Sequence, residues 1–175
     1  MMGYGYKPEL SEGAVKCPVF QTSTFVFKTA EEGKAFFAMA HGKPGYEGKA
    51  MGLIYSRINN PDMEILEERL KFWDGGEAAA AFSSGMSAIA TSLVSMLRPG
   101  DVLLFSNPVY GGTHKFIHHL LPQWGIESIG FNAGENEATI RKRIDESGMA
   151  NRIRLIYVET PANPTNDLID LAMCR

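Results

Sequence analysis

Hydrophobic residues change their spacing about a third of the way along the chain. From Asn60 onward, apolar residues recur either at the helical spacing of three and four or in short continuous runs. The short runs predict strands over residues 78–82, 102–105, 127–131 and 153–158. The helical spacing predicts helices from Pro61 to the Gly75-Gly76 pair and over residues 86–97, 113–121 and about 137–147.

Strands that alternate with helices predict an α/β fold with a mostly parallel sheet. In such sheets, ligands bind outside the carboxyl ends of the strands. Three polar or aromatic segments follow predicted strands, and they contain Ser84-Gly85, Tyr110 and Asn163. We therefore expect these three segments to share one edge of the sheet.

Residues 1 to about 57 show little sustained periodicity. One short helix is expected over residues 29–41, because Thr29 can cap it and acidic residues follow in the first turn. This segment shows no hydrophobic core of its own. The pattern predicts an extended N-terminal arm that is either disordered or packed against another body, followed by a second domain over residues 58–175.

The turn from Phe82 to Ala88 is the strongest candidate for a binding site. A run of apolar residues ends there in small residues, and a helical pattern then begins. Backbone N–H groups at the start of a helix favour an anion, so the turn can hold a phosphate. An ordinary strand-to-helix turn is the alternative explanation.

Composition narrows the class of protein without deciding it. The chain has 175 residues, of which 45% are hydrophobic and 21% are charged, with a net charge of −3. Basic residues are scattered, so we expect no nucleic-acid surface, and no apolar run is long enough to predict a membrane span. The two cysteines lack metal-type spacing and, without a signal-peptide pattern at the N-terminus, favour a cytoplasmic protein. His114 and His118 have helical metal-pair spacing but lack a third ligand, so we expect no metal site.

Four blocks in one order resemble a known enzyme family. These blocks are Tyr55-Ser56-Arg57 with Asn60-Pro61, Phe82 to Ala88, Val109 to Thr113, and Glu159 to Thr165. They resemble the pyridoxal-phosphate (PLP) enzymes of Cys and Met metabolism, which include cystathionine γ-synthases and γ-lyases, methionine γ-lyases and O-acetylhomoserine sulfhydrylases. The likeness extends from about Val19 to the last residues.

The resemblance implies a fold and an activity. The fold would be the N-terminal part of the aspartate-aminotransferase-like large domain of a PLP-dependent transferase. The activity would be γ-elimination or γ-replacement on a sulfur amino acid or an O-activated homoserine. The assembly would be a homodimer or homotetramer with shared active sites, in which the N-terminal arm contacts a neighbouring subunit.

The resemblance also implies roles for individual residues. Tyr55 and Arg57 would bind the cofactor in the active site of the partner subunit. The backbone N–H groups of Gly85 and Met86 would hold the cofactor phosphate. Tyr110 would stack on the cofactor ring and act as the acid or base at the leaving group of the substrate.

Two further residues belong to the last block. Asn163 would donate a hydrogen bond to the phenolic oxygen of the cofactor, and Glu159 would support the site. A buried structural role for Glu159 is an equally good interpretation of the sequence. Either of the prolines that flank Asn163 could follow a cis peptide bond.

The match is incomplete. In the family, the pyridine-contacting Asp, the Schiff-base Lys and the small C-terminal domain lie beyond the last block, and no lysine of this sequence matches the Schiff-base position. The 175 residues alone are therefore expected to be inactive. Two alternatives remain: a truncated, non-catalytic fragment of such an enzyme, and a phosphate-binding α/β module without PLP chemistry.

Overall fold

The computed structural model describes residues 3–175, and it divides the chain into two compact units. One unit ends at Ala81, and the other runs from Phe82 to Arg175. We call them the N-terminal unit and the sheet unit. The first two residues of the expected N-terminal arm lie outside the described range.

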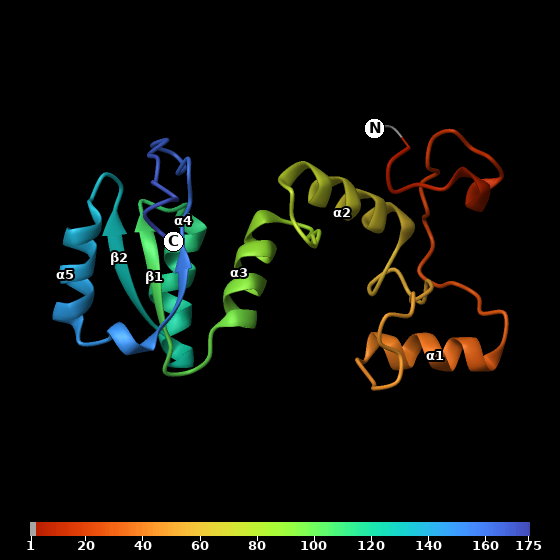
Figure 1. The fold of residues 1–175 in the computed structure, drawn as a ribbon, viewed down its shortest axis with the longest axis horizontal. Helices are drawn as coiled ribbons and strands as arrows, with labels where there is room; N and C mark the ends of the chain where they lie inside the picture. Colours follow the sequence, from red (N-terminus) through yellow and green to blue (C-terminus); the bar gives the residue numbers. More distant parts are fainter. Residues whose placement is uncertain (1–2) are drawn as a thin grey trace. The chain divides into compact units, whose positions relative to one another are not determined.

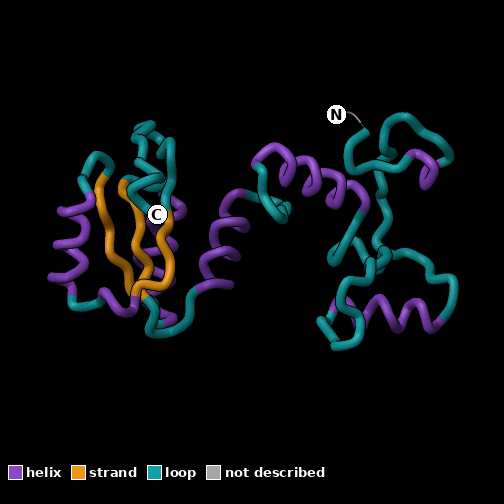
Figure 2. Tube along the Cα trace, viewed as in Figure 1, coloured by secondary structure: helices purple, strands orange, loops and turns teal. Residues whose placement is uncertain are grey.

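Loops make up most of the N-terminal unit (Figure 2). Its regular elements are the short 3-10 helix η1 (Pro8–Ser11), α1 (Ala30–Ala40) and α2 (Pro61–Asp74). The predicted helix over residues 29–41 is confirmed, because the Thr29 side chain accepts the Glu32 N–H and so caps α1. A single antiparallel bridge between Thr24 and Tyr55 is the only β pairing among the described residues of this unit.

Helix α2 begins and ends as the sequence predicts. The Asn60 side chain accepts the Asp62 N–H at its start, and Pro61 occupies the first turn. Gly75 ends the helix in the left-handed conformation, with φ of 63°, which glycine adopts without steric cost. The apolar stripe that predicted this helix nevertheless stays largely exposed, with Trp73 60% exposed.

Three parallel strands form the sheet of the second unit, with β1 (Val102–Asn107) between β2 (Glu127–Asn132) and β3 (Ile153–Tyr157) (Figure 1). These strands and their parallel order confirm the sequence prediction. The predicted strand over residues 78–82 is wrong. That segment pairs with no strand in the described residues, and the Ala81 N–H instead donates to the Glu67 carboxylate at 2.8 Å.

The helices of the sheet unit are α3 (Gly85–Met96), α4 (Gly111–Lys115) and α5 (Glu137–Ser147). The predicted helix over residues 113–121 is only partly correct. It begins at Gly111, widens into a π-helical turn (Phe116–Leu120) and ends in a 3-10 turn, η3 (Leu121–Trp124). Pro122 lacks the N–H that a continuing α-helix would need at this point. A last 3-10 turn, η4 (Ala150–Arg152), leads into β3.

Side chains of β1 alternate between two hydrophobic cores. Leu103 and Phe105 join a cluster with residues of α3 and of the helical segment that begins with α4. Val102 and Leu104 face the opposite way and join a cluster with residues of β2 and α5. The alternation follows from the two-residue repeat of a strand, and it makes β1 the buried centre of the unit.

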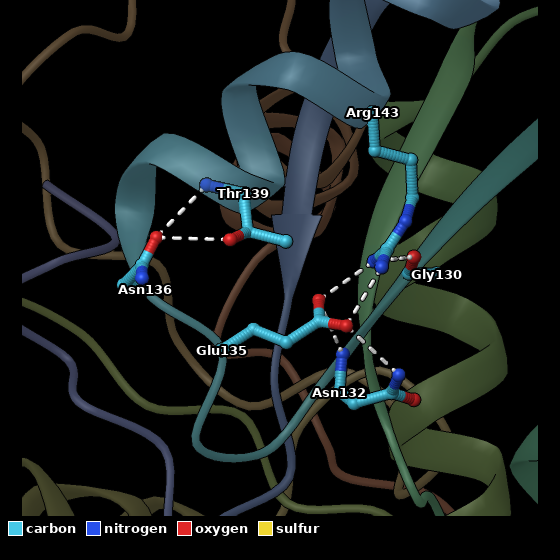
Figure 3. A network of polar contacts seen from close by, with 6 residues as sticks. All are labelled: Gly130, Asn132, Glu135, Asn136, Thr139 and Arg143. Atoms are coloured by element: carbon cyan, nitrogen blue, oxygen red, sulfur yellow. Dashed lines mark hydrogen bonds and ion pairs between the residues drawn. The ribbon is translucent and has the colours of Figure 1, made fainter.

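A polar network closes the connection from β2 to α5 (Figure 3). Arg143 donates to both carboxylate oxygens of Glu135 at 2.7 Å and to the Gly130 carbonyl at 2.9 Å. Glu135 also accepts the N–H and the side-chain amide of Asn132. The Arg143 guanidinium lowers the pKa of Glu135 to about 2, so this carboxylate is charged at neutral pH.

Candidate active site

The first part of the site is the N-terminus of α3. Ser84 caps this helix by accepting the Ser87 N–H at 3.1 Å, and the Ala88 N–H donates to the Ser84 carbonyl at 3.1 Å. The N–H groups of Gly85 and Met86 precede these bonds, so they have no partner within the helix. Gly85 is exposed and has open space beside it. The turn can therefore present two N–H groups and the positive end of the helix dipole to an anion.

Tyr110 lies beside this helix start. A Cβ atom placed on Gly112 would lie 2.7 Å from the Tyr110 ring and 2.8 Å from the Met86 sulfur. The ring and the sulfur thus occupy the space next to a residue that has no side chain. Tyr110 remains 45% exposed, so part of its ring is open to a ligand. The structure brings together Gly85, Met86 and Tyr110, which belong to two of the three segments expected at one edge of the sheet. In the described residues, no hydrogen bond joins Asn163, from the third segment, to them.

Glu159 connects three elements of the sheet unit. Its carboxylate accepts the Tyr110 backbone N–H at 2.6 Å, the Thr113 hydroxyl at 2.7 Å and the Tyr157 hydroxyl at 2.9 Å. Its own backbone N–H donates to the buried Ser106 hydroxyl at 3.1 Å. These four hydrogen bonds join the Glu159 segment to the start of α4, to β1 and to the end of β3.

Burial makes the Tyr157 hydroxyl harder to ionise. Desolvation raises the pKa of Tyr157 well above its ordinary value, and the hydrogen bond to the Glu159 carboxylate and its negative charge raise it further. Tyr157 therefore acts as a hydrogen-bond donor throughout the physiological range. Thr113, the other hydroxyl on this carboxylate, is fully buried.

Asn163 lies in an exposed loop that the chain closes on itself. The Ala162 N–H donates to the Asp167 carbonyl, and the Asn166 N–H donates to the Ala162 carbonyl. The peptide bonds that precede Pro161 and Pro164 are both cis, as the sequence allowed. The loop leaves the Asn163 side chain accessible, while Ala162 beside it is buried.

Tyr55 and Arg57 form a second group in the N-terminal unit. The Arg57 guanidinium lies 5.7 Å from the centre of the Tyr55 ring, within cation–π range. Their segment is fixed by the bridge from Tyr55 to Thr24 and by the Ser56 N–H, which donates to the Ser23 carbonyl at 3.0 Å. Both side chains are exposed, so a guanidinium and a phenol are available to a ligand.

Polar side chains at the start of α2 hold this segment in place. Asn59 accepts the Ile54 N–H and donates to the Gly52 carbonyl, each at 3.0 Å. Asn60 donates to the Ser56 hydroxyl at 3.0 Å. Both asparagines are buried. The Asn59-Asn60 pair therefore fixes the loop from which Tyr55 and Arg57 project.

The histidine pair gives no support to a metal site. The rings of His114 and His118 lie 4.3 Å apart, and His118 packs edge-on against Phe105. Partial burial lowers the pKa of His118, and the neighbouring His114 and His119 lower it further. Within residues 3–175, no group of three or more potential His, Cys, Asp or Glu ligands gathers in one place.

Sequence reasoning missed Thr113, Tyr157 and Ser106, which surround Glu159. One local signal indicates an acceptor near Tyr110, although it does not indicate these three residues. Tyr110 stands at the N-cap position of α4, and a tyrosine ring provides no cap for a helix. A hydrogen-bond acceptor from elsewhere in the chain was therefore to be expected.

The sequence matches the Cys/Met metabolism PLP-dependent enzyme family over residues 2–175. The chain belongs to this family. It is 40% identical to the L-methionine gamma-lyase of Pseudomonas putida and 34% identical to the cystathionine gamma-synthase of Mycobacterium leprae. The alignments cover 97% and 95% of this chain but only 39% and 37% of those enzymes. The chain thus spans about two-fifths of the length of the curated relatives it matches.

Solved structures agree with this assignment. The chain is similar to a crystal structure of a putative O-acetylhomoserine (thiol)-lyase from Campylobacter jejuni, with a TM-score of 0.76 and 26% identity. The match covers 97% of this chain and 38% of that one, which carries a pyridoxyl-lysine phosphate. The cofactor of the family is PLP, and the fold is that of the N-terminal part of a PLP-dependent enzyme.

The residues of this family member fit such a cofactor. The free N–H groups at the start of α3 suit its phosphate, and the exposed Tyr110 ring beside them suits its aromatic ring. The missing side chain at Gly112 lets the Tyr110 ring and the Met86 sulfur lie close to the backbone there. The sheet unit therefore offers an anion site and an aromatic surface side by side.

Proposed function

We propose that the whole protein catalyses γ-elimination or γ-replacement on a sulfur amino acid or an O-activated homoserine, with PLP as cofactor. The observation that carries this proposal is the placement of the exposed Tyr110 ring beside Met86 at the start of α3. Membership of the Cys/Met family supports the class of substrate.

Gly85 and Met86 bind the cofactor phosphate through their backbone N–H groups in this proposal. When bound, PLP supplies an electron-withdrawing ring that makes protons near the substrate amine easier to remove. Asn163, in its accessible loop, donates a hydrogen bond to the phenolic oxygen of the ring. Glu159 supports the site in this proposal by binding the backbone N–H of Tyr110.

Tyr110 has two roles in this proposal. Its ring lies against the cofactor ring and fixes the plane of the aromatic system. Its hydroxyl transfers a proton to or from the leaving group at the γ-carbon of the substrate. Tyr110 can fill both roles because Glu159 holds its backbone N–H while its ring stays exposed.

Tyr55 and Arg57 complete the site of a neighbouring subunit in a homodimer or homotetramer. The Arg57 guanidinium suits the cofactor phosphate, because its planar fork matches the oxygens of an anion. The exposure of both side chains agrees with a ligand that lies outside their own unit.

The 175 residues by themselves are expected to turn over no substrate. The sheet unit contains two lysines, Lys115 and Lys142. Lys142 pairs with Glu146 at 3.7 Å on α5, and Lys115 is exposed on α4. Adding PLP and reducing with borohydride should therefore label no single lysine stoichiometrically. A specific pyridoxyl-lysine accompanied by turnover would contradict this expectation.

Two variants of Tyr110 in the whole protein test the proposed function. Tyr110→Phe keeps the ring and removes the hydroxyl, so kcat for γ-elimination should fall about 10²–10⁴-fold with little change in PLP affinity. Tyr110→Ala should also weaken PLP binding by about 0.5–1.5 kcal/mol beyond the lost buried area. Tyr6→Phe is the matched control, because its hydroxyl binds the Ala14 carbonyl in the N-terminal unit.

The assay follows release of the leaving group and of the keto acid from methionine, cystathionine and an O-acylated homoserine. Replacement is measured by adding a thiol and detecting the new thioether. A Tyr110→Phe variant within about threefold of the parent, far short of the usual acid–base contribution, would remove Tyr110 from the chemistry. A protein that binds phosphate but consumes none of these substrates would favour a phosphate-binding module.

A further inference from the structure

The helix that begins after Tyr110 lacks the cap that the other helices have. In the described residues, each of the other four α-helices is capped by the side chain at its own N-cap position. These caps are Thr29, Asn60, Ser84 and Asn136. Helix α4 instead has Tyr110 there, and its side chain makes no capping hydrogen bond.

Glu159, from a different part of the chain, binds the start of α4 instead. It lies two residues beyond the end of β3, and its carboxylate accepts the N–H of Tyr110 and the hydroxyl of Thr113. A negative charge at this position is also favourable for the helix dipole. The arrangement holds the start of α4 without using the side chain of Tyr110, whose ring is left free.

We propose that Thr113 and Tyr157 are positioning residues for Tyr110 that act through the Glu159 carboxylate. The proposal rests on the proposed function, in which the Tyr110 hydroxyl reaches the reacting atoms. Neither Thr113 nor Tyr157 touches the substrate or the cofactor in this arrangement. Each donates its hydroxyl to the carboxylate oxygen Oε1, while Oε2 binds the backbone of Tyr110.

The two hydroxyl groups determine where that carboxylate points. A carboxyl group at the end of a side chain can rotate unless both of its oxygens are held. Thr113 is fully buried on α4, and Tyr157 is partly buried at the end of β3, so two elements hold Oε1 from different directions. The Ser106 hydroxyl holds the Glu159 backbone to β1. The result is a rigid support behind a solvent-exposed ring.

The experiment uses the holoenzyme with the variants Tyr157→Phe and Thr113→Val. Each variant removes one hydroxyl and keeps the shape of the side chain. We expect kcat to fall by roughly 10-fold in each, because small displacements of a catalytic group can reduce rates by up to about 100-fold. The visible circular dichroism of bound PLP should also change, because it reports the ring environment that Tyr110 provides.

Two matched variants separate positioning from loss of stability. Thr113→Ser keeps the hydroxyl and should retain the parent rate, even if the lost methyl group lowers the melting temperature. Tyr6→Phe removes a tyrosine hydroxyl that binds the Ala14 carbonyl at 2.8 Å in the N-terminal unit, so it should leave kcat and the dichroism unchanged. A Thr113→Ser variant as slow as Thr113→Val would overturn the proposal.

A double-variant cycle identifies Tyr110 as the residue that is positioned. In a Tyr110→Phe background, the Tyr157→Phe change should have little further effect on kcat, since the hydroxyl that needed positioning is absent. An undiminished rate loss in that background would refute a role through Tyr110. A normal rate for Tyr157→Phe and Thr113→Val, with a slow Tyr110→Phe, would refute this inference alone. A normal rate for Tyr110→Phe would refute the proposed role of Tyr110 itself.

Discussion

The two units of this chain are stabilised in different ways. The sheet unit buries two hydrophobic clusters, one on each side of β1. In the N-terminal unit, valines such as Val26 (97% exposed) and Val15 (82% exposed) lie at the surface. Hydrogen bonds of buried or partly buried polar side chains stabilise this unit instead, above all those of Asn59, Asn60 and Asp62.

This difference matches the different tasks of the units in the proposed enzyme. A parallel sheet with a packed core can hold a cofactor at a rigid edge. Exposed apolar side chains on a unit held by polar hydrogen bonds are typical of a binding surface. In our proposal, this surface binds a neighbouring subunit. We therefore expect the stability of the sheet unit to depend mainly on buried side-chain volume. The stability of the N-terminal unit should depend mainly on hydrogen bonds.

The largest expected effect is loss of core volume in the sheet unit. Leu103→Ala removes a fully buried side chain, so the free energy of unfolding should fall by about 2–5 kcal/mol. Val26→Ala, at a 97% exposed position, should change it by less than about 0.5 kcal/mol. In a Trp73→Phe background, Trp124 fluorescence reports urea unfolding of the sheet unit, where Trp124 packs near Phe116.

Equal effects of Leu103→Ala and Val26→Ala would contradict the comparison. The two variants are also measured in a Trp124→Phe background, in which Trp73 on α2 reports urea unfolding of the N-terminal unit. This measurement shows whether the N-terminal unit unfolds together with the sheet unit.

The next largest effect concerns the surface of the N-terminal unit. Arg57→Ala in the whole protein should lower activity by about 10–100-fold, as expected for one lost charged hydrogen bond. If Arg57 serves a neighbouring subunit, mixing this variant with one that lacks the cofactor-binding lysine should restore activity. The reason is that a mixed dimer has one site with both residues intact. Confirmed mixed dimers that remain inactive would argue against shared sites.

A smaller effect concerns the ion pair at the end of β2. The Arg143 guanidinium lowers the pKa of Glu135 to about 2, whereas an unfolded Glu has a pKa of about 4.3. This carboxylate therefore adds stability that is present above pH ~5 and is lost as the pH falls toward about 2. Glu135→Gln should lower stability by about 1–2 kcal/mol at neutral pH, allowing for the partial exposure of Arg143.

Urea unfolding of the parent and Glu135→Gln between pH 7 and pH ~2.5 tests this linkage. The difference between the two proteins should shrink as the pH falls. Glu137→Gln is the control, because Glu137 forms an exposed pair with Arg141 that should contribute at most about 0.5 kcal/mol. A pH-independent difference for Glu135→Gln would exclude the carboxylate charge as its cause.

The smallest expected effect is at the polar junction of the N-terminal unit. Asp62 accepts the Phe20 N–H at 2.8 Å, and so joins the arm to the first turn of α2. Asp62→Ala should lower stability by about 1 kcal/mol, because it removes this bond and a favourable charge at the helix start. Asp74→Ala, at the opposite end of α2, should be neutral or slightly stabilising. Urea unfolding of both variants is followed by Trp73 fluorescence in the Trp124→Phe background. Equal losses of stability for Asp62→Ala and Asp74→Ala would contradict a stabilising role for the Asp62 contact.

The sequence alone predicted the features that depend on near neighbours in the chain. Thr29, Asn60 and the glycine after α2 mark helix ends because each satisfies backbone groups within a few residues. Hydrophobic runs predicted β1, β2 and β3 and their parallel order. The same reasoning failed over residues 78–82, since a strand needs a partner and the nearest acceptor for Ala81 is a side chain of α2.

The motifs also identified Gly85, Met86 and Tyr110 as candidates for one site, and the structure brings these three together. Only the tertiary structure revealed what supports Tyr110. Its backbone N–H is bound by Glu159, 49 positions further along the chain, and that carboxylate is held by Thr113 and Tyr157. Local caps can be inferred from sequence because their partners are neighbours, whereas the Glu159 contact depends on β3 lying beside β1, which only the folded sheet brings about.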